Sequence, residues 1–274
     1  MNPYQIIAKR KKSIFYCISP SIVFFALQIA LVIVAVIISE IGPSRYNFLL
    51  DLSENIYTYM IPIHIAIIFI YFITFRKNEK KSFDNLFENK MSFIDIIMMT
   101  ILGISLHALV TLFFMMLSFL INGYIISGFG GYSFSSLPIQ ILTVGIFGPI
   151  AEELLCRASI FNRLRMRGSE KSAILISSLI FGIMHLNLTQ ASYAFVLGVI
   201  QAAAYIKYEN ILAPTIIHIT FNMANFIYMT PVSQILLYSE IIFTVCMAGL
   251  FLLSLRFLVK RRKADRKPDI TLNI

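Results

Sequence analysis

The chain has 274 residues, 58% of them hydrophobic and 14% charged, and this composition excludes a soluble domain in favour of a polytopic membrane protein. Its net charge of +9 comes from Lys and Arg residues that lie between hydrophobic runs and at both ends of the chain. That placement indicates topology signals and contacts with anionic lipids at the cytoplasmic face, and no nucleic-acid partner is expected.

Hydrophobic runs divide the chain into eight candidate spans, most of which reach the roughly 20 residues that a bilayer requires. The spans are 13–39, 57–75, 92–122, 136–162, 171–187, 191–207, 211–229 and 235–258. We therefore expect an all-α, polytopic membrane protein of about eight transmembrane helices, which form a single membrane domain over residues 1–274. The weakest division lies between the fifth and sixth spans, where LNLTQAS is the only break.

Basic residues between the spans predict the orientation of the chain. If eight helices cross the membrane, five basic segments fall on one side of it: 9–12, 76–90, 163–171, Lys207 and 260–267. The loops on the other side carry one basic residue between them, Arg45. By the positive-inside rule, we expect a multi-pass cell-membrane protein with both termini in the cytoplasm.

The fourth span contains two adjacent acids, Glu152 and Glu153, followed by Arg157 in the run GPIAEELLCR. An ionisable group at bilayer depth costs at least about 2.5–3.5 kcal/mol, so each one is a hypothesis of function. Glu153 and Arg157 share a helix face and can neutralise each other, whereas Glu152 points about 100° away. Pro149 lacks a backbone N–H, so we expect a loosened turn and a polar notch beside Glu152. The alternative is that Glu153 and Arg157 only hold helices together.

Two later spans carry histidines with a partner at helical spacing. Phe181 and His185 lie four residues apart in FGIMH, where the ring can fix the imidazole rotamer and Gly182 allows close helix approach. His218 and Asn222 have the same spacing in HITFN and offer two aimed hydrogen-bond donors. Both pairs are therefore candidates for the same site as the acids.

The remaining histidines, His64 and His107, have no polar neighbour at helical spacing. A lone histidine in a membrane helix more often bonds to a neighbouring helix than it catalyses a reaction. We therefore interpret both as hydrogen-bonding groups between helices and leave them out of the candidate site.

The motifs EExxxR, FxxxH and HxxxN, in this order on successive apolar helices, resemble those of the CPBP family of intramembrane proteases. This family includes the type II CAAX prenyl endopeptidases and the bacteriocin-processing Abi proteins of bacteria. The resemblance covers roughly residues 137–229, which would be the catalytic core helices. It implies an intramembrane endopeptidase that hydrolyses a peptide bond in a membrane-associated protein or peptide precursor with a Glu-activated water.

The resemblance also implies a role for each motif residue. Glu152 would be the general base, with help from His185, and His218 and Asn222 would stabilise the oxyanion of the tetrahedral intermediate. The remaining motif residues would support the site; they are Glu153, Arg157 and Phe181.

The use of a metal is left open by the sequence. Members of the family are often called metalloproteases, and Glu152, His185 and His218 match the ligand count of a catalytic zinc site, although HExxH is absent. Asparagine is a poor zinc ligand and a good oxyanion donor, so Asn222 favours a metal-free glutamate mechanism.

Two functions of other classes fit the same composition. A non-catalytic membrane scaffold, such as an immunity or sensor protein, would keep protease-like helices, but here every motif position is filled. A proton-coupled transporter would also place Glu, Arg and His at mid-membrane, but it usually shows repeated halves. Neither alternative explains the ordered motifs as well as a protease does.

The composition also bears on the substrate. The chain has no Trp and is rich in Ile, Lys, Asn and Phe, which is typical of a bacterium with an AT-rich genome. Protein prenylation is not expected there. A peptide pheromone, a bacteriocin leader or a remnant signal peptide is then a more plausible substrate than a prenylated CAAX protein.

The charge pattern yields a topology prediction. Reporters fused after Lys12, within 77–90, within 164–170 and after Lys260 should report the cytoplasm, because basic loops are retained on that side. A reporter within 124–135 should report the outside. Paired fusions to alkaline phosphatase and to a green fluorescent protein measure both outcomes, and a cytoplasmic signal from 124–135 would contradict the eight-span arrangement.

Overall fold

The computed structural model describes residues 14–41, 51–52, 54–78, 86–87, 89–120, 135–228 and 240–260. Within these ranges the chain is helical and forms no strand, which confirms the expected all-α class. Several segments used in the charge argument lie wholly outside the described residues, namely 9–12, Arg45, 124–134 and 261–267.

Helical segments occupy the predicted positions within the described ranges. They are α2 (Ile14–Ile41), α4 (Ile56–Asn78), α6 (Phe93–Leu120), a composite helix from Leu137 to Arg165, α10 (Glu170–Ile183), α11 (Leu188–Tyr208), α12 (Leu212–Tyr228) and α14 (Glu240–Val259). Five of these, namely α2, α4, α6, the composite helix and α14, are long and apolar enough to cross a membrane. With 14 residues, α10 is shorter than a bilayer requires, so the number of complete spans stays a prediction.

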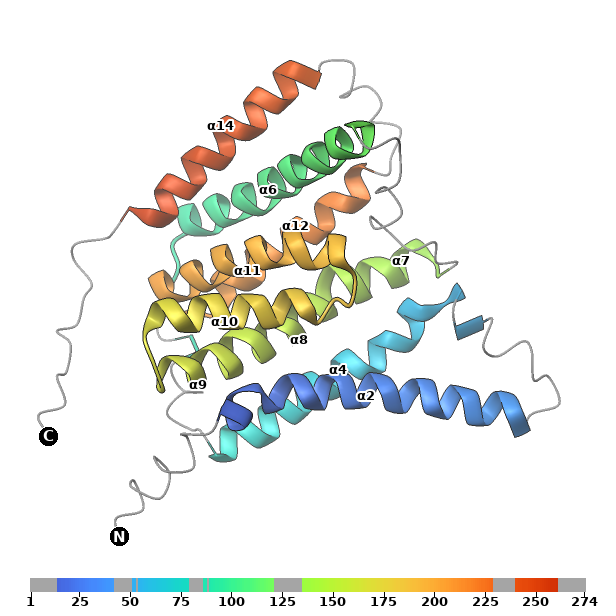
Figure 1. The fold of residues 1–274 in the computed structure, drawn as a ribbon. Coiled ribbons are helices and arrows are strands. Elements are labelled where there is room, and N and C mark those ends of the chain that lie inside the picture. Colours follow the sequence, from blue (N-terminus) through green and yellow to red (C-terminus); the bar gives the residue numbers. More distant parts are fainter. Residues whose placement is uncertain are drawn as a thin grey trace, which may run out of the picture.

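Successive helices run in opposite directions (Figure 1). One end of the bundle holds the first residues of α2, α6, α10 and α12. The same end holds the last residues of α4, the composite helix, α11 and α14. At this end the Tyr208 hydroxyl, from α11, donates a hydrogen bond to Asp95 of α6 at 2.9 Å. The composite helix ends at Arg165, α11 ends at Tyr208 and α14 ends at Val259, so the basic residues of 163–171, Lys207 and Lys260 belong to this end. The arrangement agrees with the charge pattern read from the sequence.

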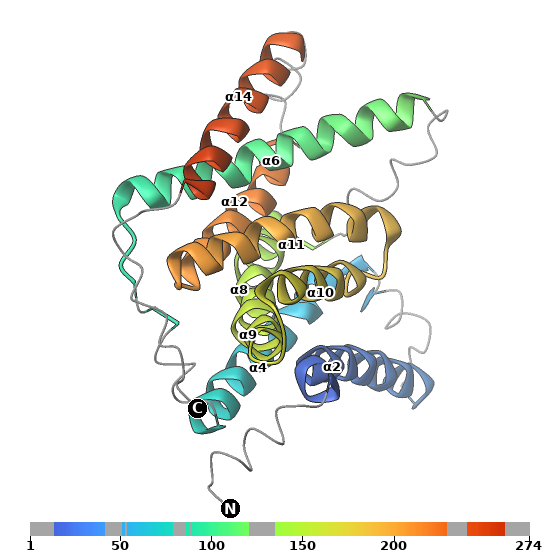
Figure 2. The same cartoon turned by 60° about the vertical axis from the view of Figure 1, so that its left-hand side comes forward.

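The helices pack around the composite helix and α12. The helix α12 contacts α6, α11 and the composite helix, whereas α2 and α4 pack against the composite helix from the other side (Figure 2). Between α10 and α11, a Cβ on Gly182 would lie 2.8 Å from the carbonyl oxygen of Ala191. Glycine is therefore required there, and the expected close approach of two helices is confirmed.

The composite helix changes its winding along its length. It consists of α7 (Leu137–Gln140), the π-helix η2 (Ile141–Phe147), α8 (Gly148–Glu153), the π-helix η3 (Leu154–Phe161) and α9 (Asn162–Arg165). Two wide segments therefore flank the short α-helical piece that carries both acids. Wide turns of this kind occur frequently at functional sites.

Pro149 explains why the first wide segment ends beside the acids. In a π-helix each N–H bonds to the carbonyl five residues earlier, and the Gly148 N–H indeed bonds to the Thr143 carbonyl. The next N–H in this register would belong to Pro149, which has none. The Val144 carbonyl is therefore left open to a donor from outside the helix, and the loosened turn expected before Glu152 is a π-helical one.

Candidate active site

Arg157 lies at the centre of a buried polar network. Its side chain and that of Glu153 are fully buried, and Nε donates to Glu153 Oε2 at 3.1 Å. Nη2 donates to Gln201 Oε1 at 3.0 Å, and Nη1 donates to Ser177 Oγ at 3.4 Å. The guanidinium also lies over the Phe181 ring, 5.4 Å from its centroid. The predicted i, i+4 pair is thus present, with the further partners that a desolvated cation requires.

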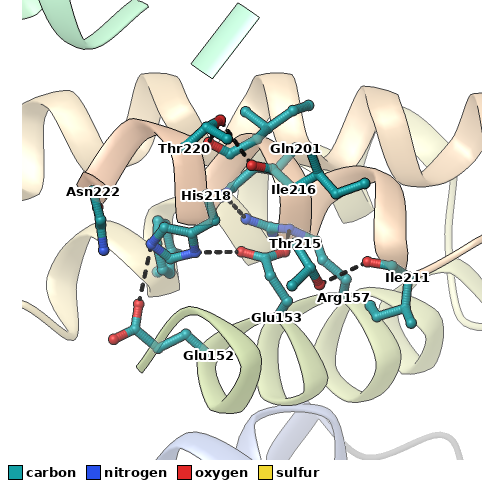
Figure 3. Close-up of polar contacts among 12 residues, drawn as sticks. Glu152, Glu153, Arg157, Gln201, Ile211, Thr215, Ile216, His218, Thr220 and Asn222 are labelled. Atoms are coloured by element: carbon teal, nitrogen blue, oxygen red, sulfur yellow. Dashed lines mark hydrogen bonds and ion pairs between the residues drawn. The ribbon is translucent and has the colours of Figure 1, made fainter. Parts of the chain in front are cut away.

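His218 of α12 lies opposite both acids of the composite helix (Figure 3). Its Nδ1 lies 3.0 Å from Glu153 Oε1, and its Nε2 lies 3.6 Å from Glu152 Oε2. A carboxylate only accepts hydrogen bonds, so Nδ1 carries a proton and donates to Glu153. Because adjacent residues of a helix point about 100° apart, one imidazole can reach both acids.

The two acids differ in their access to the surroundings. The Glu152 side chain is 19% exposed, whereas those of Glu153 and His218 are 0% and 3% exposed. Glu153 is held by Arg157 and His218, so its oxygens are occupied. Glu152 is therefore the more accessible of the two acids, and Glu153 fixes the orientation of the imidazole.

Asn222 follows His218 by one turn on the same face of α12. Its Nδ2 donates to the Val144 carbonyl at 2.8 Å, which is the carbonyl that Pro149 leaves open in η2. An asparagine amide has two N–H donors, so one remains available to a ligand. The wide turn is thereby joined to α12 by a residue that the sequence predicts to be catalytic.

His185 lies just beyond the end of α10. Its Nδ1 lies 2.9 Å from the carbonyl oxygen of Phe181 and donates to it, so Nε2 is the unprotonated nitrogen of the neutral ring. The Phe181 ring makes edge contacts with His185 and His218, with centroid separations of 5.1 and 5.5 Å. The predicted contact between Phe181 and His185 is confirmed. In the described part of the chain, however, His185 forms no hydrogen bond or ion pair with Glu152.

The three residues considered as zinc ligands do not form a ligand set. Among the described residues, no group of three or more His, Cys, Asp or Glu side chains is placed to hold a metal ion. His218 directs Nδ1 to Glu153 and Nε2 to Glu152, while His185 is bonded to the backbone. The geometry of Glu152, His185 and His218 thus does not fit a zinc site.

Sequence reasoning missed several members of the network. Gln201 is the single polar residue in LGVIQAAAYI, and its position in an apolar run was a signal that could have been used. Ser177 is fully buried in LISSLI and gives only a weak signal of the same kind. The bond from His218 to Glu153 could not be read from spacing, because 65 residues separate the two side chains.

The segment that carries this site is similar to known proteins. Residues 134–224 match the family model described as type II CAAX prenyl endopeptidase Rce1-like. Over 118 residues the chain is 31% identical to YdiL of Bacillus subtilis (strain 168), whose name describes a membrane peptidase; the match covers 43% of this chain and 48% of YdiL.

A second relative is the membrane-embedded CAAX protease MroQ of Staphylococcus aureus (strain USA300). The chain is 36% identical to it over 92 residues, which are 31% of this chain and 37% of MroQ. The chain thus spans about half the length of YdiL and little more than a third of that of MroQ. No solved structure matches the chain.

The buried network yields a stability prediction. Arg157→Ala should lower the amount of folded protein in the membrane, because removing one partner of a buried ion pair typically costs roughly 3–5 kcal/mol. Immunoblots of membrane fractions and thermal unfolding of the purified protein measure the effect.

Arg165→Ala is the matched control for this prediction. Arg165 is 40% exposed and makes loose ion pairs with Glu170 at 3.6 Å and Glu209 at 3.9 Å. Exposed pairs of this kind contribute no more than about 1 kcal/mol, so the control should accumulate like the wild type. Equal accumulation and equal unfolding temperatures of the two variants would show that the Arg157 network does not hold the fold.

Proposed function

We propose that the chain, whose residues 134–224 match the Rce1-like model of type II CAAX prenyl endopeptidases, is an intramembrane endopeptidase of the CPBP family. The observation that carries the proposal is the pair formed by Glu152 and His218 at 3.6 Å, with the other imidazole nitrogen bonded to the buried Glu153. A partly exposed acid beside an oriented imidazole suits the activation of water.

In the proposed reaction Glu152 takes a proton from a water molecule, and the resulting hydroxide adds to the carbonyl carbon of the scissile peptide bond. His185 assists by accepting a hydrogen bond from that water at Nε2, the nitrogen left free by its bond to the Phe181 carbonyl. Glu152 then returns the proton to the leaving nitrogen as the C–N bond breaks. The products are a carboxylic acid and an amine, which exchange a proton to become a carboxylate and an ammonium group.

Two donors would stabilise the oxyanion of the intermediate. The first is His218, whose Nδ1–H is committed to Glu153, so that donation from Nε2 requires the protonated ring. The Glu153 carboxylate stabilises that cation. The second donor is the N–H of Asn222 that the Val144 carbonyl does not use. One such donor typically contributes about 100–1000-fold to the rate.

The charge pattern supports a topology and a set of partners for this enzyme. The end of the bundle that carries the basic residues of 163–171 and Lys207 would face the cytoplasm and contact anionic lipids. The substrate would be a membrane-associated peptide or protein, and a bacterial peptide precursor fits the composition better than a prenylated protein does.

Replacement of Glu152 tests the function directly. Glu152→Gln keeps the side-chain shape but removes the base, so it should abolish turnover while the protein still accumulates in membranes. Mass spectrometry of membrane peptides should then find an uncleaved precursor that wild-type cells lack. Glu170→Gln, which alters an acid with 47% of its side chain exposed, should leave the peptide profile unchanged. Identical profiles for wild type and Glu152→Gln would favour a non-catalytic scaffold.

A second prediction separates the metal-free reaction from a zinc-dependent one. Without a metal, activity should survive exhaustive chelation, and Asn222→Ala should lower the turnover rate by roughly 100-fold or more with a smaller effect on substrate binding. The assay would use purified protein and the precursor that accumulates with Glu152→Gln. About one zinc per chain in an active preparation, lost together with activity on chelation and restored by zinc, would overturn the metal-free reaction.

A further inference from the structure

His64 of α4 is a buried imidazole that the proposed reaction does not use. Its side chain is 5% exposed, and its Nδ1 makes no hydrogen bond to any described residue. A buried polar atom without a partner typically costs about 1–3 kcal/mol, so an apolar residue here would make the helix contact more stable. The sequence predicts a hydrogen bond from His64 to a neighbouring helix, but Nδ1 does not form one with any described residue.

His64 and Glu152 both lie beside Gly148. A Cβ built on Gly148 would lie 3.3 Å from His64 Cε1 and 3.8 Å from Glu152 Oε1, so both groups lie within 4 Å of a single point. Cε1 is the carbon bonded to both ring nitrogens, so the imidazole ring and the carboxylate approach each other beside Gly148.

The position of His64 is set by the same wide turn that opens the site. The hydroxyl of Thr143 in η2 lies 2.9 Å from the Tyr57 carbonyl oxygen of α4 and 2.8 Å from the Ile139 carbonyl oxygen of its own helix, so its one proton is shared between the two. Tyr57 and His64 are seven residues apart, which is about two helical turns, so both lie on the same face of α4. Ile67 and Tyr71 extend this face, and both are buried. The contact between α4 and the composite helix therefore holds His64 in place.

We propose that His64 is a positioning residue of the active site, which shares a water molecule with Glu152 and thereby orients the carboxylate and the water that it activates. His64 Cε1 and Glu152 Oε1 lie within about 7 Å of each other beside Gly148, a separation that one water molecule can bridge, and a buried water needs such polar partners. A Cβ on Gly148 would also lie 2.8 Å from the Thr143 carbonyl oxygen, so no side chain is tolerated between the two groups. The expected effect of His64 on turnover rests on the proposed function, whereas its placement beside Glu152 does not.

The placement of His64 can be tested without an activity assay. The chain has four histidines, so full-length protein labelled with ¹⁵N-histidine in lipid nanodiscs gives one pair of ring-nitrogen signals from each of four imidazoles. The loss of one pair in His64→Asn assigns the His64 signal. Glu152→Gln should shift the His64 signal, whereas the signal of His107, which packs against Phe221 on α12 with ring centroids 5.0 Å apart, should stay. An unshifted His64 signal would overturn the proposal.

The effect on turnover is tested with two substitutions. His64→Leu fills the space without a polar group and should slow cleavage of the precursor that accumulates with Glu152→Gln, on the order of 10- to 100-fold at equal protein level. His64→Asn keeps a polar group near the position of Nδ1 and should restore most of the rate. His107→Leu is the control for loss of a buried imidazole, and it should cleave like the wild type.

The outcomes separate the two proposals. A His64→Leu variant that turns over at the wild-type rate, or a His64→Asn variant that is as slow as His64→Leu, would overturn the positioning role. If Glu152→Gln leaves the peptide profile unchanged, the proposed function fails, and the ¹⁵N shift alone then decides whether His64 and Glu152 are coupled.

Discussion

The buried guanidinium of Arg157 needs a full set of partners, and it obtains them from three different helices. Glu153 is supplied by its own helix, Ser177 by α10 and Gln201 by α11. The other oxygen of Glu153 accepts from His218 of α12. One desolvated ion pair therefore fixes how α10, α11 and α12 lie around the composite helix, because a displaced helix would leave a buried polar group unsatisfied.

Burial places two identical carboxyl groups in two different environments. Glu153 is fully buried, and its two oxygens are bonded to Arg157 and His218. Glu152 is partly exposed and faces the one imidazole nitrogen that Glu153 does not hold. With His218 protonated, the two acids would be balanced by two cations, which is how charged groups are tolerated at bilayer depth.

A missing hydrogen bond connects the local structure of the composite helix to the site. Pro149 cannot donate to Val144, and the free carbonyl accepts from Asn222 instead. The same wide turn offers Thr143 to the backbone of α4, which brings His64 beside Gly148. Irregular backbone within a membrane is tolerated where other helices satisfy it, and here the compensating groups are the ones that surround Glu152.

The spacing of residues in the sequence predicted the contacts between motif residues of the same helix. It predicted the helical class, the pair of Glu153 with Arg157, the contact of Phe181 with His185, and the loosened turn at Pro149, because positions three to four residues apart meet on a helix face. It could not predict that Glu153 binds His218, that Asn222 bonds to Val144, or that His64 lies near Glu152. Those contacts join residues that are 65 or more positions apart in the chain. They exist only because packed helices bring particular faces together, and that packing was decided by tertiary structure.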